Sequence, residues 1–172
     1  SYESQKLTSF CGVATSVTVL NALGHQVTQT SLFNDDASAV SPIWEIALGG
    51  MTLDTLEALL EANGVQVAKR RADSACVSGF RNSIIRNLMT DRDYLVVNYQ
   101  REKLGQGAVG HISPIAAYNE ASDKVLIMDT AAYKYPPTWV QIDALYKAMS
   151  TIDPENGLSR GWLEVRESPK RP

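Results

Sequence analysis

The hydrophobic and polar positions along this chain predict buried helices first. Cys11 is followed by the apolar run GVATSVTVLNAL, which has helical length, carries no charged side chain and can end at Gly24. The segment TLDTLEALLEANG predicts a second helix, with Thr52 as its N-cap and Gly64 after its last turn. The segment SGFRNSIIRNLM predicts a third helix, which Ser78 would cap and whose apolar side chains share one face.

The second half of the chain is richer in β-branched and aromatic runs, which predict strands. These runs cover residues 65–68, 94–99, 112–118, 125–129 and 161–165, and a further helix is predicted at residues 142–149. Helices followed by mostly antiparallel strands indicate an α+β fold. No repeat or Pro/Gly/Ser-rich linker interrupts the chain, so we predict one domain over residues 1–172.

The segment IAAYNEASDKVLIMD predicts a β-hairpin whose turn spans residues 119–123. In an antiparallel hairpin centred near Glu120, residues whose numbers sum to about 240 lie opposite each other. His111 and Asp129 satisfy this sum, so we predict that they are cross-strand neighbours unless a bulge shifts the register. The alternative is that His111 is only a strand-edge residue and Asp129 only a turn residue.

Cys11 precedes the predicted first helix, and this position favours reactivity. Unpaired backbone N–H groups and the positive end of the helix dipole stabilise a thiolate over a thiol. The alternative is a packed core cysteine, because free cysteines are among the most buried residues. Together with His111 and Asp129, Cys11 fits a relay in which histidine takes the thiol proton and aspartate orients the imidazole.

Composition and charge exclude several classes of protein. The chain has 172 residues, of which 44% are hydrophobic and 20% charged, which is ordinary for a globular domain. A net charge of −3 without a basic stripe argues against nucleic acid as a partner. Residues 7–34 contain no Asp, Glu, Lys or Arg, but their Ser, Thr, Asn and Gln content argues against a membrane span.

Two cysteines and two histidines are too few and too scattered for a disulfide scaffold or a zinc site, so we predict no protein metal site. Cys76 has no neighbouring His, Lys or Arg that would lower its pKa, and we predict a tolerated thiol; a second acylation site is the alternative. The chain begins at Ser1, so an upstream segment could have been cleaved, and bacterial cytoplasm and periplasm both stay open.

Several sequence blocks closely resemble the catalytic domain of phytochelatin synthases, a branch of the papain-like cysteine peptidase fold. The blocks are FCGVATSVTVLNAL, GHISPIAAYN, LIMDTAAYKYPPTWV, KAMSTID and RGW. The resemblance runs from about Gln5 to Val165, and GHxSPIxxY and YKYPPxWV are its most specific patterns. It implies a prokaryotic-type catalytic domain, in which the helix that carries the nucleophilic cysteine packs on an antiparallel sheet.

By this resemblance Cys11 is the nucleophile, His111 the general base and then acid, and Asp129 the orienting carboxylate. Gln5 matches the family's oxyanion-hole glutamine, a type of donor that contributes about 3 kcal/mol to barrier lowering. Without the resemblance, Gln5 would be interpreted as an exposed polar residue near a terminus.

The resemblance also implies residues that bind the substrate. Asp153 and Arg160 match family positions that hold the γ-glutamyl end of glutathione, since an ammonium pairs with a carboxylate and a carboxylate pairs with a guanidinium. Gly110 is expected to lie against the substrate. Without the resemblance, Asp153 would be assigned to a surface turn and Arg160 to a strand entrance.

The family acts on glutathione, and the reaction follows from the resemblance. The nucleophile cuts the Cys–Gly bond, releases glycine and keeps a γ-glutamylcysteinyl thioester, which passes to a second glutathione or to water. No cofactor is expected for acylation, and cadmium or another thiophilic metal would enter as its glutathione thiolate complex, the acceptor substrate. A homodimer is one assembly that the sequence leaves open.

Two departures from the family pattern affect the expected reaction. Ala132 stands where known members carry an arginine three residues after the triad aspartate, and plant members add a cysteine-rich C-terminal region beyond the point where this chain ends. Both favour an enzyme that mainly hydrolyses glutathione, with weak metal regulation. The alternatives are a glutathione S-conjugate hydrolase with little transfer activity and an inactive thiol- or metal-binding module.

Overall fold

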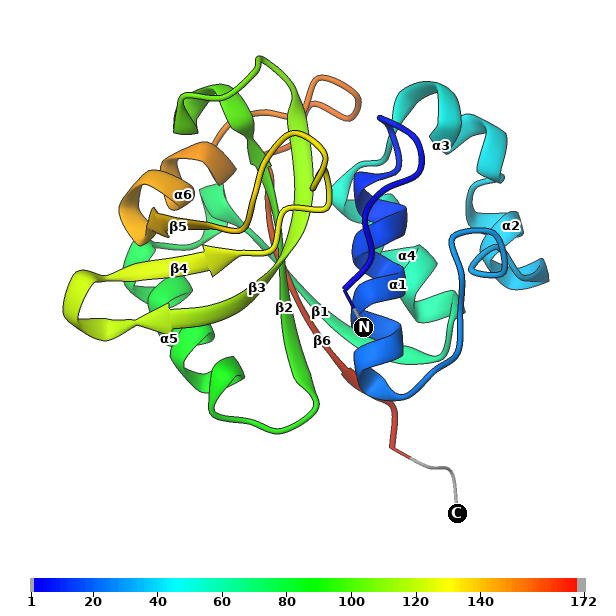
Figure 1. Ribbon diagram of the computed structural model, residues 1–172, viewed down its shortest axis with the longest axis horizontal. Coiled ribbons are helices and arrows are strands. Elements are labelled where there is room, and N and C mark those ends of the chain that lie inside the picture. Colours follow the sequence, from blue (N-terminus) through cyan, green and yellow to red (C-terminus); the bar gives the residue numbers. More distant parts are fainter. Residues whose placement is uncertain (1, 170–172) are drawn as a thin grey trace.

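The centre of the molecule is an antiparallel sheet with the strand order β1-β6-β2-β3-β4-β5 (Figure 1). The computed structural model describes residues 2–169. The strands are β1 (Val65–Arg71), β2 (Asp93–Gln100), β3 (Gly110–Asn119), β4 (Lys124–Ile127), β5 (Thr138–Gln141) and β6 (Gly161–Glu167). Every neighbouring pair in this order is antiparallel, as predicted for the α+β class.

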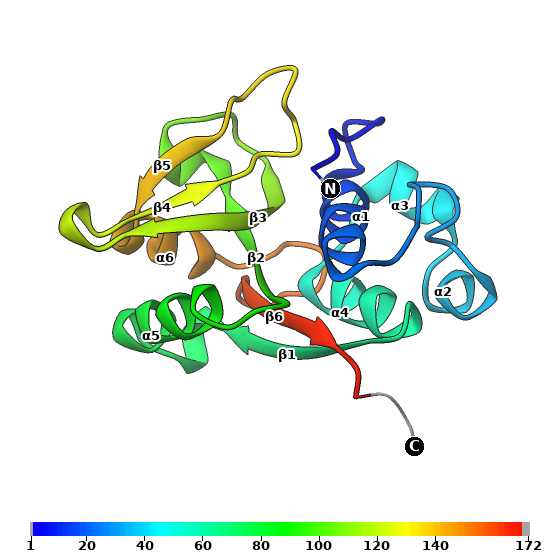
Figure 2. The ribbon, with the colours of Figure 1, turned by 60° about the horizontal axis from the view of Figure 1, so that its bottom comes forward.

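Helices cover both faces of the sheet. They are α1 (Cys11–Leu23), α2 (Asp35–Val40), α3 (Ile43–Gly49), α4 (Leu53–Ala62), α5 (Val77–Leu88) and α6 (Ile142–Met149), with short 3-10 helices η1 (Ala72–Ser74), η2 (Arg101–Leu104) and η3 (Glu120–Ser122). Helices α1 and α4 pack on β3, β1 and β6. From the other side, α5 packs on β2 and β3, and α6 packs on β2, β5 and β6 (Figure 2). Among residues 2–169, no helix has the length and apolarity needed to cross a bilayer.

Two hydrophobic clusters fill the spaces on either side of the sheet, because side chains alternate along each strand. In β2, Val96 packs with α1 and α4, whereas Leu95 and Val97 pack with α5 and α6. In β6, Leu163 and Trp162 divide between the two clusters in the same way. Each face of the sheet is therefore a buried layer.

The predicted first and second helices are confirmed. Helix α1 begins at Cys11 after an N-cap residue that makes no side-chain hydrogen bond, and it ends at Gly24, whose φ of 103° is left-handed. Helix α4 is capped by the Thr52 hydroxyl, which accepts a hydrogen bond from the Thr55 N–H. The predicted cap of the third helix is wrong, because α5 begins one residue before Ser78, at Val77, and has no side-chain cap.

The sequence pattern missed three short elements, α2, α3 and β5, and extended one strand too far. Helices of six and seven residues are too short for a helical period to stand out. Strand β5 follows two prolines, which are depleted in strands. Strand β4 ends at Ile127, so Asp129 lies in the connection beyond it.

The predicted hairpin register is also wrong. Tyr118 pairs with Val125, and Ile115 pairs with Ile127, with a register shift between Ile115 and Ala117. The residue numbers of these partners sum to 243 and then 242, so His111 and Asp129 are not directly opposite. Because η3 forms part of the turn, the centre of the hairpin lies closer to the C-terminus than the predicted centre at Glu120. The bulge in β3 then shifts its pairing with β4 by one residue.

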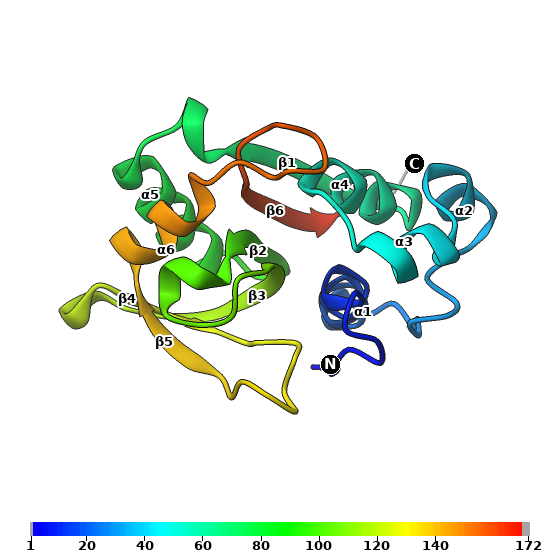
Figure 3. The same cartoon turned by 90° about the horizontal axis from the view of Figure 1, so that it is seen from above.

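The first turn of α1 lies at the same end of the molecule as the connections that follow β2 and β4 and precede β6 (Figure 3). Residues far apart in the sequence therefore meet at this end of the molecule, where α1 packs against β3.

Candidate active site

Cys11 is the first residue of α1 and lies beside His111, near the start of β3. The helix packs against β3, and the Thr15 hydroxyl donates a 3.1 Å hydrogen bond to the Ile112 carbonyl, which fixes the two elements together. Cys11 retains 9% of its surface at the edge of a cleft, so its thiol can meet a substrate. The first turn of α1 has no side-chain cap, which leaves its N–H groups and positive dipole end beside the thiol.

His111 and Asp129 meet although they are not register partners. The His111 Nε2 lies 3.0 Å from the Asp129 Oδ1, and both side chains are almost fully buried. Asp129 reaches the imidazole from the connection after β4, where the chain leaves the sheet. Because Nε2 is engaged in this way, Nδ1 is the nitrogen available to the thiol.

The electrostatic environment favours a thiolate–imidazolium pair. Burial alone would raise the pKa of the Cys11 thiol, but His111 and the backbone N–H groups of Ile112 and Gly12 outweigh it, so the pKa lies below its ordinary value. Burial alone would lower the pKa of His111, but Asp129 and Cys11 raise it above its ordinary value. Cys11 therefore has the environment of a nucleophile, not of an inert core cysteine.

Asp129 is held by a buried arginine that the sequence analysis did not identify. The Arg101 Nη1 and Nη2 donate to the two carboxylate oxygens at 2.6 and 2.7 Å, and the Ala131 N–H donates to Oδ1 at 2.9 Å. Arg101 is only 2% exposed and stacks on the Tyr135 ring, 4.3 Å from its centroid. Burial alone would raise the pKa of Asp129, but His111 and Arg101 together hold it far below its ordinary range.

Ser113 is a second residue whose part in the site was not predicted. Its hydroxyl oxygen lies 2.8 Å from the His111 Nε2 and accepts a hydrogen bond from the Thr130 N–H at 3.3 Å. The side chain is completely buried. Because His111 and Ser113 are two residues apart on one strand, their side chains share a face. This i, i+2 spacing is the signal that could have identified Ser113.

Gln5 lies beside the site, but its amide is already engaged. Its Nε2 donates to the carbonyls of Leu7 and Thr8, both at 2.9 Å, and its backbone N–H donates to the Thr130 carbonyl. The side chain is buried and lines a cleft that it shares with His111. A role in oxyanion binding therefore requires one of these N–H groups to turn toward the substrate, and that role remains a prediction.

A cleft of about 280 Å³ on one side of Cys11 contains the other predicted substrate residues, Asp153, Arg160 and Gly110. Gly110 packs closely against the guanidinium, and a Cβ at this position would lie 3.1 Å from the Arg160 Nη2, so a larger residue would push Arg160 aside. The Arg160 Nη1 donates to the Thr151 hydroxyl and the Ile152 carbonyl, whereas its buried Nε has no partner. The Nε is thus available for a carboxylate, beside an Nη2 that lies 3.7 Å from Asp153.

Charged and polar contacts hold the loop of residues 153–158, which carries Asp153. Arg160 lies 3.7 Å from Asp153 across this loop, and the Asp153 N–H donates to the Leu158 carbonyl. The Asn156 side chain donates to Asp54 on α4, which also pairs with Lys69 and Arg71.

A second cleft, of about 380 Å³, adjoins the first and shares Val109, Gly110 and His111 with it. The residues that line it come from the N-terminal segment, α3, η2 and the connection after β4; they include Gln5, Leu48, Arg101, Val109, His111, Tyr133, Lys134 and Tyr135. His111 therefore lines both clefts, and this arrangement suits a reaction in which one group leaves and another enters.

The remaining cysteine and histidine lie outside this site. Cys76 is exposed at the start of α5, and its Sγ lies 3.2 Å from the Ser78 hydroxyl. The His25 Nε2 lies 3.5 Å from Glu167. Within residues 2–169, no group of three or more His, Cys, Asp or Glu side chains is arranged to hold a metal ion.

The helix α1 packed on the antiparallel sheet gives the chain a papain-like α+β fold. The structure is similar to the peptidase domain of Streptococcus ComA, a bifunctional ABC transporter, with a TM-score of 0.58 over 98% of this chain and all of that domain. The two share 12% of their residues, so the likeness concerns the fold alone.

Residues 1–162 match the phytochelatin synthase family, and the chain belongs to this family. It is 36% identical to glutathione gamma-glutamylcysteinyltransferase 3 of Lotus japonicus, over 99% of this chain and 37% of that protein. It is 27% identical to the glutathione gamma-glutamylcysteinyltransferase of Schizosaccharomyces pombe, over 93% of this chain and 40% of that protein. The chain thus spans about two fifths of the length of these relatives.

Proposed function

We propose that this chain is a glutathione γ-glutamylcysteinyltransferase and hydrolase that works through an acyl-enzyme on Cys11. The observation that carries the proposal is the Cys11 thiol at the first turn of α1, beside a histidine whose Nε2 is 3.0 Å from Asp129. The names of the relatives support glutathione as the substrate.

In the first half-reaction, the Cys11 thiolate attacks the carbonyl carbon of the cysteinyl residue of glutathione. The oxyanion that forms would accept hydrogen bonds from the Cys11 backbone N–H and from Gln5. The C–N bond then breaks, His111 gives its proton to the amine of glycine, and a thioester remains on Cys11.

In the second half-reaction, His111 acts as the base. It removes a proton from water or from the amino group of a second glutathione, and this nucleophile attacks the thioester carbonyl. Release of the Cys11 sulfur gives γ-glutamylcysteine in the first case and a phytochelatin in the second. A thiophilic metal such as cadmium enters as the glutathione thiolate complex, part of the acceptor substrate.

The acyl-enzyme gives the most direct test of this function. Incubation with glutathione alone, followed by a rapid acid quench, is expected to leave one γ-glutamylcysteinyl group on the protein, measured by intact mass. The same single adduct is expected with cadmium added, and the Cys11→Ala variant should show none. An unmodified parent protein without cadmium, or two adducts with it, would contradict a one-site enzyme.

Donor recognition gives a second prediction. Arg160→Ala is expected to weaken glutathione use because the unpaired Nε would no longer receive the glutamyl carboxylate. The fall in kcat/KM should correspond to about 2 kcal/mol or more of lost transition-state stabilisation. Asp153→Ala should act similarly through the ammonium. The measurement is glycine release with varied glutathione.

The dipeptide Cys-Gly serves as the control for this assignment, since it lacks the γ-glutamyl group. It should be a poor substrate for the parent protein, and Arg160→Ala should not weaken its cleavage further. Rapid cleavage of Cys-Gly by the parent would remove the basis for both assignments.

The balance between hydrolysis and transfer is expected to depend on the second cleft. Ala132 is exposed between Ala131 and Tyr133, which line this cleft together with Lys134. Ala132→Arg would add a cation where a glutathione carboxylate could bind, so we expect a higher ratio of phytochelatin to dipeptide in the products. Ala132→Gln, similar in reach but uncharged, is the matched control, and an equal rise in both variants would contradict a role for the charge.

A further inference from the structure

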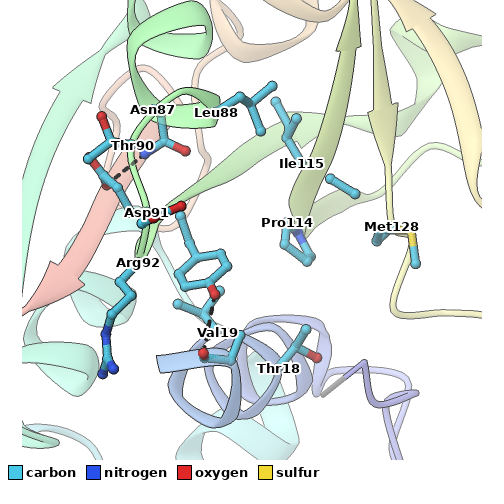
Figure 4. Close-up of a pocket in the computed structure, with 14 residues that line it drawn as sticks. Thr18, Val19, Asn87, Leu88, Thr90, Asp91, Arg92, Pro114, Ile115 and Met128 are labelled. Atoms are coloured by element: carbon cyan, nitrogen blue, oxygen red, sulfur yellow. Dashed lines mark hydrogen bonds between the residues drawn. The ribbon is translucent and has the colours of Figure 1, made fainter. Parts of the chain in front are cut away.

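A cavity of about 380 Å³ lies away from the two clefts, between α1, the start of β2 and the middle of β3 (Figure 4). None of its lining residues lines either cleft beside Cys11. The proposed reaction therefore leaves this cavity unexplained.

One wall of the cavity presents a buried oxygen without a partner. Asn87 is 1% exposed, and its Nδ2 donates to the Asp93 Oδ1 at 2.7 Å. This hydrogen bond fixes the orientation of the amide, because the amide oxygen would not face a carboxylate. The Asn87 Oδ1 has no hydrogen-bond partner, and Figure 4 shows it directed from α5 toward the space before Ile115. A buried acceptor without a donor is costly, and a ligand with an N–H group would satisfy it.

The other polar groups of the cavity include two carboxylates, together with the Thr18 and Thr90 hydroxyls. The Asp93 carboxylate lies beside Asn87, and the Asp91 carboxylate is exposed at the mouth. The Tyr94 hydroxyl donates its proton to the Ala22 carbonyl at 3.2 Å, so its oxygen offers only lone pairs to a ligand. This lining suits a donor-rich, positively charged group and disfavours an anion.

The arginines near this wall are occupied elsewhere. The Arg92 side chain extends away from the cavity in Figure 4 and contacts the Leu23 carbonyl and Glu167. Arg86 pairs with Glu164 at 2.9 Å. Arg166 donates to the Gln66 side chain at 3.2 Å. Arg166 and Arg86 act on the Asp93 carboxylate through space, but burial and Glu164 outweigh them and raise its pKa. Among the described residues, no arginine side chain donates a hydrogen bond to Asn87 or Asp93.

Apart from Thr18 and Thr90, the rest of the lining is apolar. It consists of Val19 and Ala22 from α1, Leu88 from α5, Pro114, Ile115 and Ala116 from β3, and Met128. A bare metal ion or a fully hydrated cation would leave this surface without contacts. An ammonium on a short hydrocarbon chain would satisfy the acceptors and the apolar wall together.

We propose that this cavity binds a small primary alkylammonium, whose N–H groups donate to the Asn87 Oδ1 and the Asp93 carboxylate. Its hydrocarbon part contacts Ile115 and Met128. The ligand bridges the helix that carries Cys11 and the strand that carries His111, so binding also stabilises the packing of α1 on β3. The proposal does not depend on the reaction at Cys11.

Titration with n-butylammonium chloride, followed by ¹H–¹⁵N NMR of the backbone amides, tests this site. We expect saturable shifts at Leu88, Ala116 and Met128. Butan-1-ol, which has the same chain without the charge, should bind at least tenfold more weakly, and sodium butyrate should produce no saturable shift. Equal binding of the alcohol, or no saturable binding of the ammonium, would overturn the proposal.

Two variants locate the binding. Ala116→Phe should fill the cavity from an exposed position and weaken n-butylammonium binding at least tenfold. Ala121→Phe, an equal change in the exposed turn of the same hairpin, should leave binding unchanged. Asp93→Asn should also weaken binding tenfold.

Three outcomes of these experiments contradict the site. They are binding that survives Ala116→Phe, binding that Ala121→Phe weakens equally, and amide shifts that change with protein concentration before any ligand is added. The last would mean that a second copy of the chain occupies the cavity.

Discussion

Replacing Cys11 with alanine is expected to abolish glycine release from glutathione, with a loss of at least about 10⁴-fold in kcat. The thiolate forms the covalent intermediate, and no other described thiol lies in the clefts beside His111. Cys11→Ser should be nearly as severe, because a hydroxyl beside the same histidine lacks the low pKa of the thiol. Glycine release measures the effect, and circular dichroism shows whether α1 is retained.

Cys76→Ser is the matched control, since this thiol is exposed at the start of α5 and lies outside the site. Its activity should equal that of the parent protein. An equal loss in the Cys11 and Cys76 variants would contradict the assignment of a single nucleophile.

The sequence could predict the long helices and the place of Cys11 at the start of one of them because both depend on local patterns. An uncharged apolar run after Cys11 can only be buried, and α1 is buried along most of its length. The helix dipole and free N–H groups at its start then follow from geometry that is the same in every helix. By contrast, α2, α3 and β5 are held by tertiary contacts that their own short sequences do not reveal.

The contact between His111 and Asp129 was predicted correctly for a reason that was only partly right. The hairpin was expected to place them opposite each other, but η3 and the bulge between Ile115 and Ala117 change the register. The two side chains still meet because the chain leaves the sheet after Ile127 and lets Asp129 reach toward the imidazole. A bulge of this kind depends on packing across the whole sheet and has no clear local signal.

Arg101 shows what remained hidden from the sequence. It follows β2, and it reaches Asp129 only because β2 pairs with β3 in a register that places Tyr99 opposite His111. Both strands were predicted, but the pairing of β2 with β3 was not. A buried arginine requires a carboxylate partner, but the sequence alone did not show that Arg101 was buried.

Asp129→Asn is expected to lower kcat by about 10² to 10⁴-fold while changing KM little. The carboxylate fixes the Nε2–H tautomer and stabilises the imidazolium, and an amide at this position does neither. The substitution would also leave Arg101 buried without a negative partner, a change that typically destabilises a protein by about 3 to 5 kcal/mol. Thermal unfolding must therefore accompany the kinetics, and the activity should be measured well below the variant's Tm.

The pH dependence of Cys11 alkylation by iodoacetamide separates catalysis from stability in this variant. In the parent protein the pKa of Cys11 is lowered and that of His111 is raised, so the thiolate–imidazolium pair should persist on both sides of the ordinary histidine pKa. Loss of the Asp129 charge removes a cause that raises the pKa of His111, so the imidazolium should lose its proton at a lower pH than in the parent. The upper pH limit of the pair then falls. The thiolate itself persists above this limit, so the inflection in the alkylation rate that marks loss of the imidazolium proton should move to a lower pH than in the parent. An unchanged profile with parent-like turnover would mean that Asp129 does not act on His111, whereas an unchanged profile with lower Tm would limit its role to holding Arg101.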